Sequence, residues 1–199
     1  MNIISWNTTN QCHLSCPHCY RDAGANLEQE LNTAEAKKML DQIKAANFHL
    51  MIFSGGEPLL RADIFELMSY AAEIGLRPVL GTSGGLIDAE IAQKLKEAGV
   101  LAAGISLDSV QPNKHDQFRG EEGLFLKVEN AFEELKKVGI PLQTHMTVMD
   151  WNLDELDIET RFRNGCLAGA SYCIVNPVGD VQPSAYLDLK VGNVREENF

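Results

Sequence analysis

The stretch that decides the fold runs from residue 3 to residue 19 and reads IISWNTTNQCHLSCPHC. Its first seven residues are rich in β-branched and aromatic side chains, which predicts a strand over 3–9. Cys12, Cys16 and Cys19 follow at once, so they lie on a loop at the carboxyl end of that strand. Three thiolates on one short loop can bind three irons of a cubane cluster and leave the fourth iron open. Zinc with His13 or His18 as a fourth ligand is the alternative, although zinc sites usually bring a second ligand pair.

Outward from this loop, strand-like and helix-like segments alternate along the chain. Strands are predicted at 49–55, 77–83, 101–108 and 141–149, and helices at 33–46, 63–74, 88–98 and 124–138. Thr33 is expected to cap the first helix, and the polar segment 112–123 is expected to be a loop. Short connections and apolar strands indicate a parallel sheet covered by helices, wound as an open sheet or as part of a barrel.

Polar and glycine-rich motifs follow the ends of the predicted strands. Gly55-Gly56-Glu57-Pro58 follows the second strand, Thr82-Ser83-Gly84 ends the third, and Ser106 ends the fourth. The carboxyl ends of parallel strands meet at one edge of a sheet, where α/β proteins bind their ligands. The cysteine loop and these motifs are therefore expected to form one site.

The cysteine spacing C-x3-C-x2-C, together with Gly55-Gly56-Glu57-Pro58, resembles the radical S-adenosylmethionine (SAM) superfamily. The resemblance implies an α/β fold of the radical SAM barrel type and a [4Fe–4S] cluster on Cys12, Cys16 and Cys19. The open iron would bind the amino and carboxylate groups of SAM. Reductive cleavage by an oxidoreductase of this kind gives a 5′-deoxyadenosyl radical, and an electron donor such as ferredoxin or flavodoxin is implied.

The same resemblance suggests which residues hold SAM. Gly55 and Gly56 let the backbone approach the ligand, and Glu57 is expected to accept a hydrogen bond from the SAM ammonium group. The further pocket residues are expected to be Thr82, Ser106 and Arg119, placed around the ribose and the carboxylate. Without the resemblance, these three would be interpreted as a turn cap, a core hydroxyl and a surface charge.

Three other polar residues are interpreted without a ligand. Asp108 is expected to bond its local loop, and His115 and His145 are interpreted as ordinary histidines because nothing in the sequence pairs them with a base or a metal.

After residue 150 the alternation breaks. Segment 151–159 reads as the start of a helix and then runs into a Gly-rich tail, so the predicted division is a core at 1–158 and a tail at 159–199. The tail resembles the start of a SPASM domain, which implies an auxiliary iron–sulfur site on Cys166 and Cys173. Ser184 stands where that module carries a further cysteine.

Taken together, the sequence motifs of the core and the tail are most similar to the branch of the family that acts on haem-type tetrapyrroles. This branch includes haem d1 and alternative haem biosynthesis proteins. A peptide maturase and a truncated, non-catalytic Fe–S or SAM-binding module remain alternatives, as does a structural zinc domain. Radical SAM cores commonly have six βα units, whereas this sequence supplies five. We therefore expect a partial barrel with an exposed fifth strand, and hypothesise that the chain lacks an internal segment.

The amino-acid composition disfavours some kinds of binding partner. The chain has 28 acidic and 17 basic residues and a net charge of −11, which disfavours binding to nucleic acid or to an anionic membrane surface. The start lacks the basic and apolar regions of a signal peptide. Five cysteines, three of them clustered, indicate a reducing compartment, so a cytoplasmic protein is expected.

Overall fold

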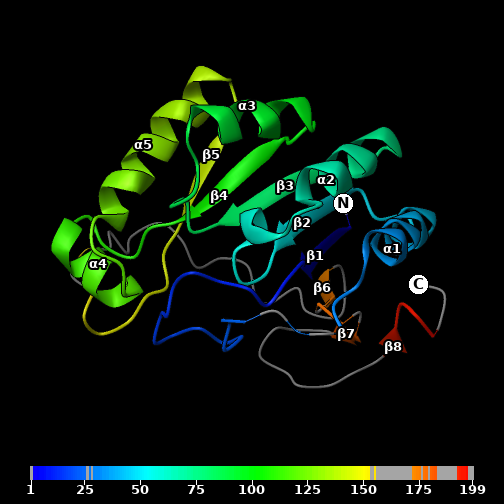
Figure 1. The fold of residues 1–199 in the computed structure, drawn as a ribbon, viewed down its shortest axis with the longest axis horizontal. Coiled ribbons are helices and arrows are strands. Elements are labelled where there is room, and N and C mark those ends of the chain that lie inside the picture. The colour runs from blue at the N-terminus through cyan, green and yellow to red at the C-terminus, as the bar shows by residue number, and fades with distance from the viewer. Residues whose placement is uncertain are drawn as a thin grey trace.

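The strands of the chain form one sheet, and the helices cover one side of it (Figure 1). The computed structural model describes residues 2–25, 27, 29–152, 155, 172–175, 177–178, 180–182 and 192–196. Its strands are β1 (Ile3–Asn7), β2 (Leu50–Ser54), β3 (Arg77–Thr82), β4 (Ala102–Ser106), β5 (Leu142–His145), β6 (Tyr172–Val175), β7 (Asp180–Gln182) and β8 (Gly192–Asn193). The helices are α1 (Thr33–Ala45), the 3-10 turn η1 (Pro58–Leu60), α2 (Ile64–Glu73), α3 (Ala89–Glu97), α4 (Pro112–Arg119) and α5 (Leu124–Lys137).

The strand order is β5-β4-β3-β2-β1-β6-β7-β8. From β5 through β6 in this order, each strand is parallel to the next, whereas β7 is antiparallel to β6 and β8 is antiparallel to β7. The predicted α/β fold with five parallel βα strands is confirmed. None of the described helices combines the length and the apolar content that crossing a bilayer requires.

Two local predictions were wrong. Helix α1 is capped by Asn32 rather than by Thr33, because the Asn32 side chain accepts from the Glu35 amide while the Glu35 carboxylate accepts from the Asn32 amide. The expected loop at 112–123 contains α4, since Pro112 supplies a pre-set first turn and Gly120 ends the helix with φ 77°. The mean hydropathy of α4 is low, so its polar sequence did not indicate a helix. Its buried side chains nevertheless hold residues of the site in place.

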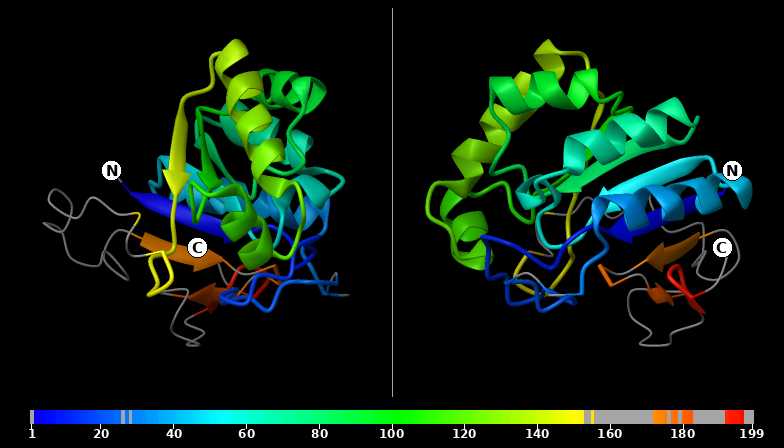
Figure 2. Two further views of the ribbon diagram at one scale, coloured as in Figure 1. Left: turned by 90° about the vertical axis from the view of Figure 1, so that its left-hand side faces the viewer. Right: turned by 45° about the vertical axis from the view of Figure 1, so that its right-hand side comes forward.

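The two faces of the sheet carry different side chains. Trp6, Phe53, Leu80 and Ile105 point toward the helices and are fully buried, so the core lies between the sheet and the helices. Figure 2 shows these helices following the curve of the sheet. The opposite face carries no helix among the described residues and presents mostly small or polar residues near the strand ends. Such a face leaves room for a ligand rather than forming a second core.

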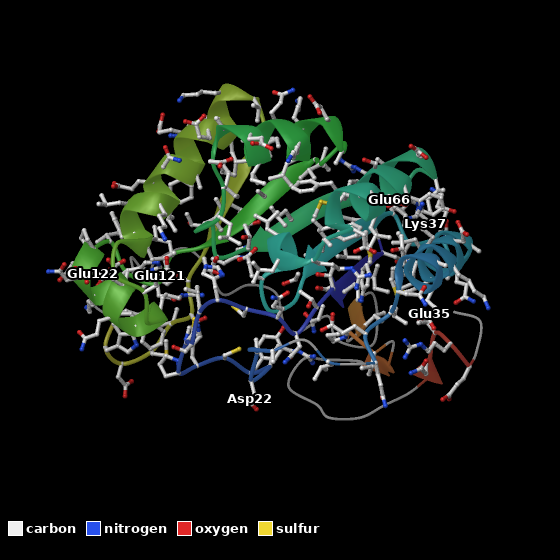
Figure 3. All side chains as sticks on the ribbon, in the orientation of Figure 1. Asp22, Glu35, Lys37, Glu66, Glu121 and Glu122 are labelled. Atoms are coloured by element: carbon white, nitrogen blue, oxygen red, sulfur yellow. The ribbon has the colours of Figure 1, made fainter. Side chains whose placement is uncertain are left out.

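The tail joins the same sheet on the side away from β5. Strand β6 pairs with β1, with Cys173 opposite Ile4, and Arg195 forms an ion pair of 2.8 Å with Glu35 on α1. Figure 3 shows Glu35 on α1, facing the tail. Strand β5 is at the other end of the sheet, so the described tail strands do not cover it. The boundary at 158/159 stays a prediction. Cys166, Ser184 and most of the expected helix at 151–159 lie outside the described residues, and Cys173 is described by its backbone alone.

Candidate functional site

One cavity of about 250 Å³ opens at the carboxyl ends of the parallel strands. It gathers residues that are far apart in sequence: the three cysteines of the loop after β1, the two glycines after β2, and polar residues at the ends of β3, β4 and β5. The residues lining it are Cys12, Leu14, Cys16, His18, Cys19, Tyr20, Arg21, Ser54, Gly55, Gly56, Gly81, Thr82, Ser83, Ser106, Arg119, His145 and Thr147. Of the residues predicted to hold SAM, all but Glu57 line this cavity.

The cysteine loop is held in place by backbone contacts and one carboxylate. Cys12 donates its amide to the carbonyl of Gly24 at 2.9 Å. Glu30 accepts from the Asn10 amide at 2.7 Å and from the Thr9 hydroxyl at 3.1 Å. Glu30 therefore fixes the chain between β1 and the first cysteine. Sequence reasoning missed it, because nothing local distinguishes Glu30 from the surface acids beside it.

The glycines after β2 pack directly on the cysteine loop. Gly55 has φ 138°, and a Cβ there would lie 2.7 Å from the Thr9 carbonyl oxygen. A Cβ on Gly56 would lie 2.3 Å from the Gln11 carbonyl oxygen. The Gly56 amide also donates to the Thr9 carbonyl at 2.9 Å. Any side chain at these positions would push the two loops apart, so the glycines set the position of the cysteines as well as leaving room for a ligand.

Glu57 lies beneath the cavity rather than in it. Its side chain is 0% exposed, and its carboxylate accepts from the Thr82 hydroxyl at 2.7 Å, the Ser83 hydroxyl at 2.6 Å and the Ser83 amide at 2.9 Å. The expected direct contact between Glu57 and a SAM ammonium group is therefore not what this arrangement offers. Glu57 instead orients Thr82 and Ser83, which do line the cavity, and so links the ends of β2 and β3.

Arg119 connects the cavity to a buried ion pair. Its Nε and Nη2 both lie 2.6 Å from Oδ2 of Asp108, which is fully buried. Its Nη1 lies 3.8 Å from the Sγ of Cys16. The other carboxylate oxygen of Asp108 accepts from the Thr147 amide at 2.9 Å. The guanidinium fork expected for a ligand carboxylate is thus held by Asp108, and Nη1 brings positive charge beside a cysteine sulfur. Asp108 was expected to bond its local loop, but its carboxylate instead joins α4 to the segment after β5.

The three thiols fit an iron–sulfur cluster better than a single ion. Burial raises the pKa of Cys12 and of Cys16, although the Arg119 charge opposes the effect at Cys16, so binding metal must displace their protons. Among the described residues, no three His, Cys, Asp or Glu side chains converge closely enough to hold one metal ion. A tetrahedral zinc ion needs such convergence, whereas a cubane takes each thiolate on a different iron. The three thiols line one cavity, which suits the cubane.

Two histidines line the cavity, of which the sequence indicated His18 only as a ligand of the alternative zinc site and His145 not at all. The His18 ring stacks on Phe118 with centroids 4.6 Å apart, and burial lowers its pKa. His145 ends β5 directly opposite Ser106 of β4, and burial lowers its pKa as well. The alternation of β4 and β5 puts both residues on the face of the sheet that carries no helix. That alternation is the sequence signal that could have identified His145.

The chain is similar to known proteins in sequence and in fold. A family model described as the radical SAM superfamily matches residues 6–162. The chain is 28% identical to the "AdoMet-dependent heme synthase" of Methanosarcina barkeri, covering 99% of this chain and 80% of the relative. It is 38% identical to that organism's "Fe-coproporphyrin III synthase" and 31% identical to the "Mycofactocin maturase MftC" of Mycolicibacterium smegmatis, each over 77% of this chain and 39% of the relative. A solved structure, "Native anSMEcpe with bound AdoMet", has a TM-score of 0.73 at 20% identity, covering 98% of this chain and 78% of that one; it shows the fold alone.

The alignment with the haem synthase also bears on the hypothesis that the chain lacks an internal segment. It spans 280 positions, although the chain has 199 residues, so roughly 80 positions of the relative have no counterpart here. The alignment with the Fe-coproporphyrin III synthase spans 155 positions, close to the number of residues before the expected break. Both observations are in keeping with the hypothesis that an internal segment is absent from the chain.

Proposed function

Because the chain belongs to the radical SAM superfamily, we propose that it cleaves SAM reductively at a [4Fe–4S] cluster and acts on a haem-type tetrapyrrole. The observation that carries the proposal is the single cavity in which three cysteine thiols meet the strand-end residues. The tetrapyrrole substrate rests on the relatives, two of which are named for haem or Fe-coproporphyrin III synthesis.

The proposal gives each group of residues a task. Cys12, Cys16 and Cys19 would hold the cluster, which when bound supplies the electron for SAM cleavage. Gly55 and Gly56 would leave room for the amino end of SAM, because a side chain there meets backbone instead. The other cavity residues with a proposed role in SAM binding are Thr82, Ser106 and Arg119.

Glu57 and Asp108 do not reach the ligand in this scheme. Glu57 holds Thr82 in place, and Asp108 holds Arg119, so both act as positioning residues. A positioning residue lowers the cost of ordering the site when the ligand binds, since the polar groups already point the right way.

The proposal also includes an auxiliary cluster, an electron donor and a location in the cell. Cys166 and Cys173 would contribute to an auxiliary iron–sulfur site. A ferredoxin or flavodoxin would supply the electron, and the enzyme would work in the cytoplasm, where such donors keep the cluster reduced.

The test begins with anaerobic reconstitution of the chain with iron and sulfide, followed by reduction and addition of SAM. We expect 5′-deoxyadenosine, detected by chromatography, and its loss in Cys16→Ala. Cluster and SAM binding without 5′-deoxyadenosine would favour the non-catalytic module, and stoichiometric zinc without iron would favour the zinc domain.

Substrate choice is tested in the same assay. Iron coproporphyrin III should raise the yield of 5′-deoxyadenosine and be altered in mass, whereas a precursor peptide should not. The similarity to a mycofactocin maturase makes the peptide the relevant comparison. Turnover of the peptide and not of the tetrapyrrole would overturn the substrate assignment while leaving SAM cleavage intact.

A further inference from the structure

The cavity contains one imidazole that nothing in the proposed SAM site uses. His145 lies at the carboxyl end of β5, and its ring lines the same cavity as the three cysteines. Among the described residues, no group hydrogen-bonds to this ring, and only the backbone of His145 pairs with β4, where its carbonyl accepts from Leu107 at 2.9 Å. The side chain is exposed at the cavity, so its ring nitrogens are open to a ligand that enters there.

Gly104 makes the position of this ring possible. A Cβ on Gly104 would lie 2.4 Å from Cε1 of His145 and 2.9 and 3.0 Å from its two nitrogens. The nitrogen-bearing edge of the ring therefore rests on the sheet where the side chain is missing. Gly104 lies on the face that carries no helix, so His145 reaches across that face instead of pointing out from the edge strand.

The ring is in the right state to bind metal. Partial desolvation of the ring against the sheet lowers the pKa of His145, which favours the neutral imidazole with a free lone pair. Among the described charged side chains, Arg21 and Arg119 also line the cavity, and Arg119 is paired with Asp108. Neutral imidazole is the side chain that most often binds haem iron.

From this geometry we propose that His145, lying across Gly104 beside the cluster loop, is an axial ligand to the iron of the tetrapyrrole substrate. The inference rests on the proposed function, because it assumes a tetrapyrrole in this cavity. It goes further by requiring that the substrate contain iron. The iron must also lie over the face of β4 and β5 that carries no helix. The macrocycle is then held close to the cysteine loop by one coordination bond, which leaves its side chains free to turn toward SAM.

The test uses ferric coproporphyrin III and metal-free coproporphyrin III as probes for the cluster-loaded chain. Absorption and electron paramagnetic resonance spectra report the iron ligand, and fluorescence of the metal-free probe reports the macrocycle. We expect His145→Ala to lose the iron-ligand spectrum and to bind the iron probe at least about tenfold more weakly, equivalent to about 1.4 kcal/mol. Its affinity for the metal-free probe should not change, and free imidazole should restore the spectrum in His145→Gly.

Two variants serve as controls. His49→Ala removes an exposed histidine beside the amino end of β2, at the opposite edge of the sheet, and should leave both probes unaffected. His18→Ala removes the other cavity histidine, whose Nδ1 is buried without a partner, and should keep the iron-ligand spectrum.

The outcomes separate this inference from the function on which it rests. An unchanged iron spectrum in His145→Ala, or its loss in His18→Ala alone, would overturn the ligand assignment while the tetrapyrrole proposal stands. Failure of both probes to bind the wild-type chain would overturn both. Formation of 5′-deoxyadenosine by His145→Ala shows in each case that the SAM site is intact, since His145 has no role in holding the cluster.

Discussion

Replacing Asp108 by asparagine should destabilise the fold far more than the loss of a surface charge would. The Asp108 side chain is 0% exposed and that of Arg119 is 10% exposed, and they meet at 2.6 Å. The substitution preserves shape but leaves the guanidinium without its counter-charge. Removing one partner of a buried ion pair costs about 3–5 kcal/mol.

The Asp108 carboxylate connects two parts of the fold. Asp108 joins α4 to the segment after β5, because it accepts from Arg119 on one side and from the Thr147 amide on the other. In a chain of this size each kcal/mol shifts the melting temperature by roughly 2–4 °C, so a fall of roughly 6–20 °C is expected. Equilibrium unfolding in urea, followed by circular dichroism, gives the free energy directly.

Two further variants make the test specific. Asp108→Asn combined with Arg119→Met removes both charges and should recover much of the stability lost in Asp108→Asn, since no unpaired charge remains. Glu66→Gln breaks the exposed pair with Lys37, which joins α2 to α1 (Figure 3), and should cost less than about 1 kcal/mol. A loss below about 1 kcal/mol in Asp108→Asn, or no recovery in the double variant, would refute the reasoning.

Three more predictions follow from the same contacts. Glu57→Gln puts an amide where three donors point and should lower the free energy of unfolding by about 3 kcal/mol in urea titration; an unchanged value would contradict the buried hydrogen bonds. Gly104→Ala should displace the His145 ring at a cost of about 1–3 kcal/mol and remove the iron-ligand spectrum, whereas the double variant with His145→Ala should regain stability. His115 is fully buried with its pKa lowered by burial, so the folded chain keeps it neutral while the unfolded chain protonates it near 6.5. The free energy of unfolding should therefore fall as the pH drops below about 6.5, and His115→Gln should reduce that slope; an equal slope in both would rule His115 out.

Local patterns determined much of this protein. The cysteine spacing predicts the cluster ligands, because three thiolates on one short loop have few other uses. The alternation of apolar strands and amphipathic helices determined a parallel sheet, and parallel strands bring their carboxyl ends to one edge. Gly55 and Gly56 could be assigned to close backbone approach from the sequence as well, because glycine has no side chain.

Only the tertiary structure decided which polar groups face one another. Glu57 belongs beneath the cavity, and Arg119 is held by Asp108, because the positions of β3 and α4 bring together residues that are 25 and 11 positions apart. The partner of a buried charge is set by packing between elements, and no periodicity in the sequence records it. The same holds for His145, whose position depends on the missing side chain of Gly104 on the neighbouring strand. Sequence determines which elements form and which residues can bind, while contacts between elements determine which of them reach the ligand.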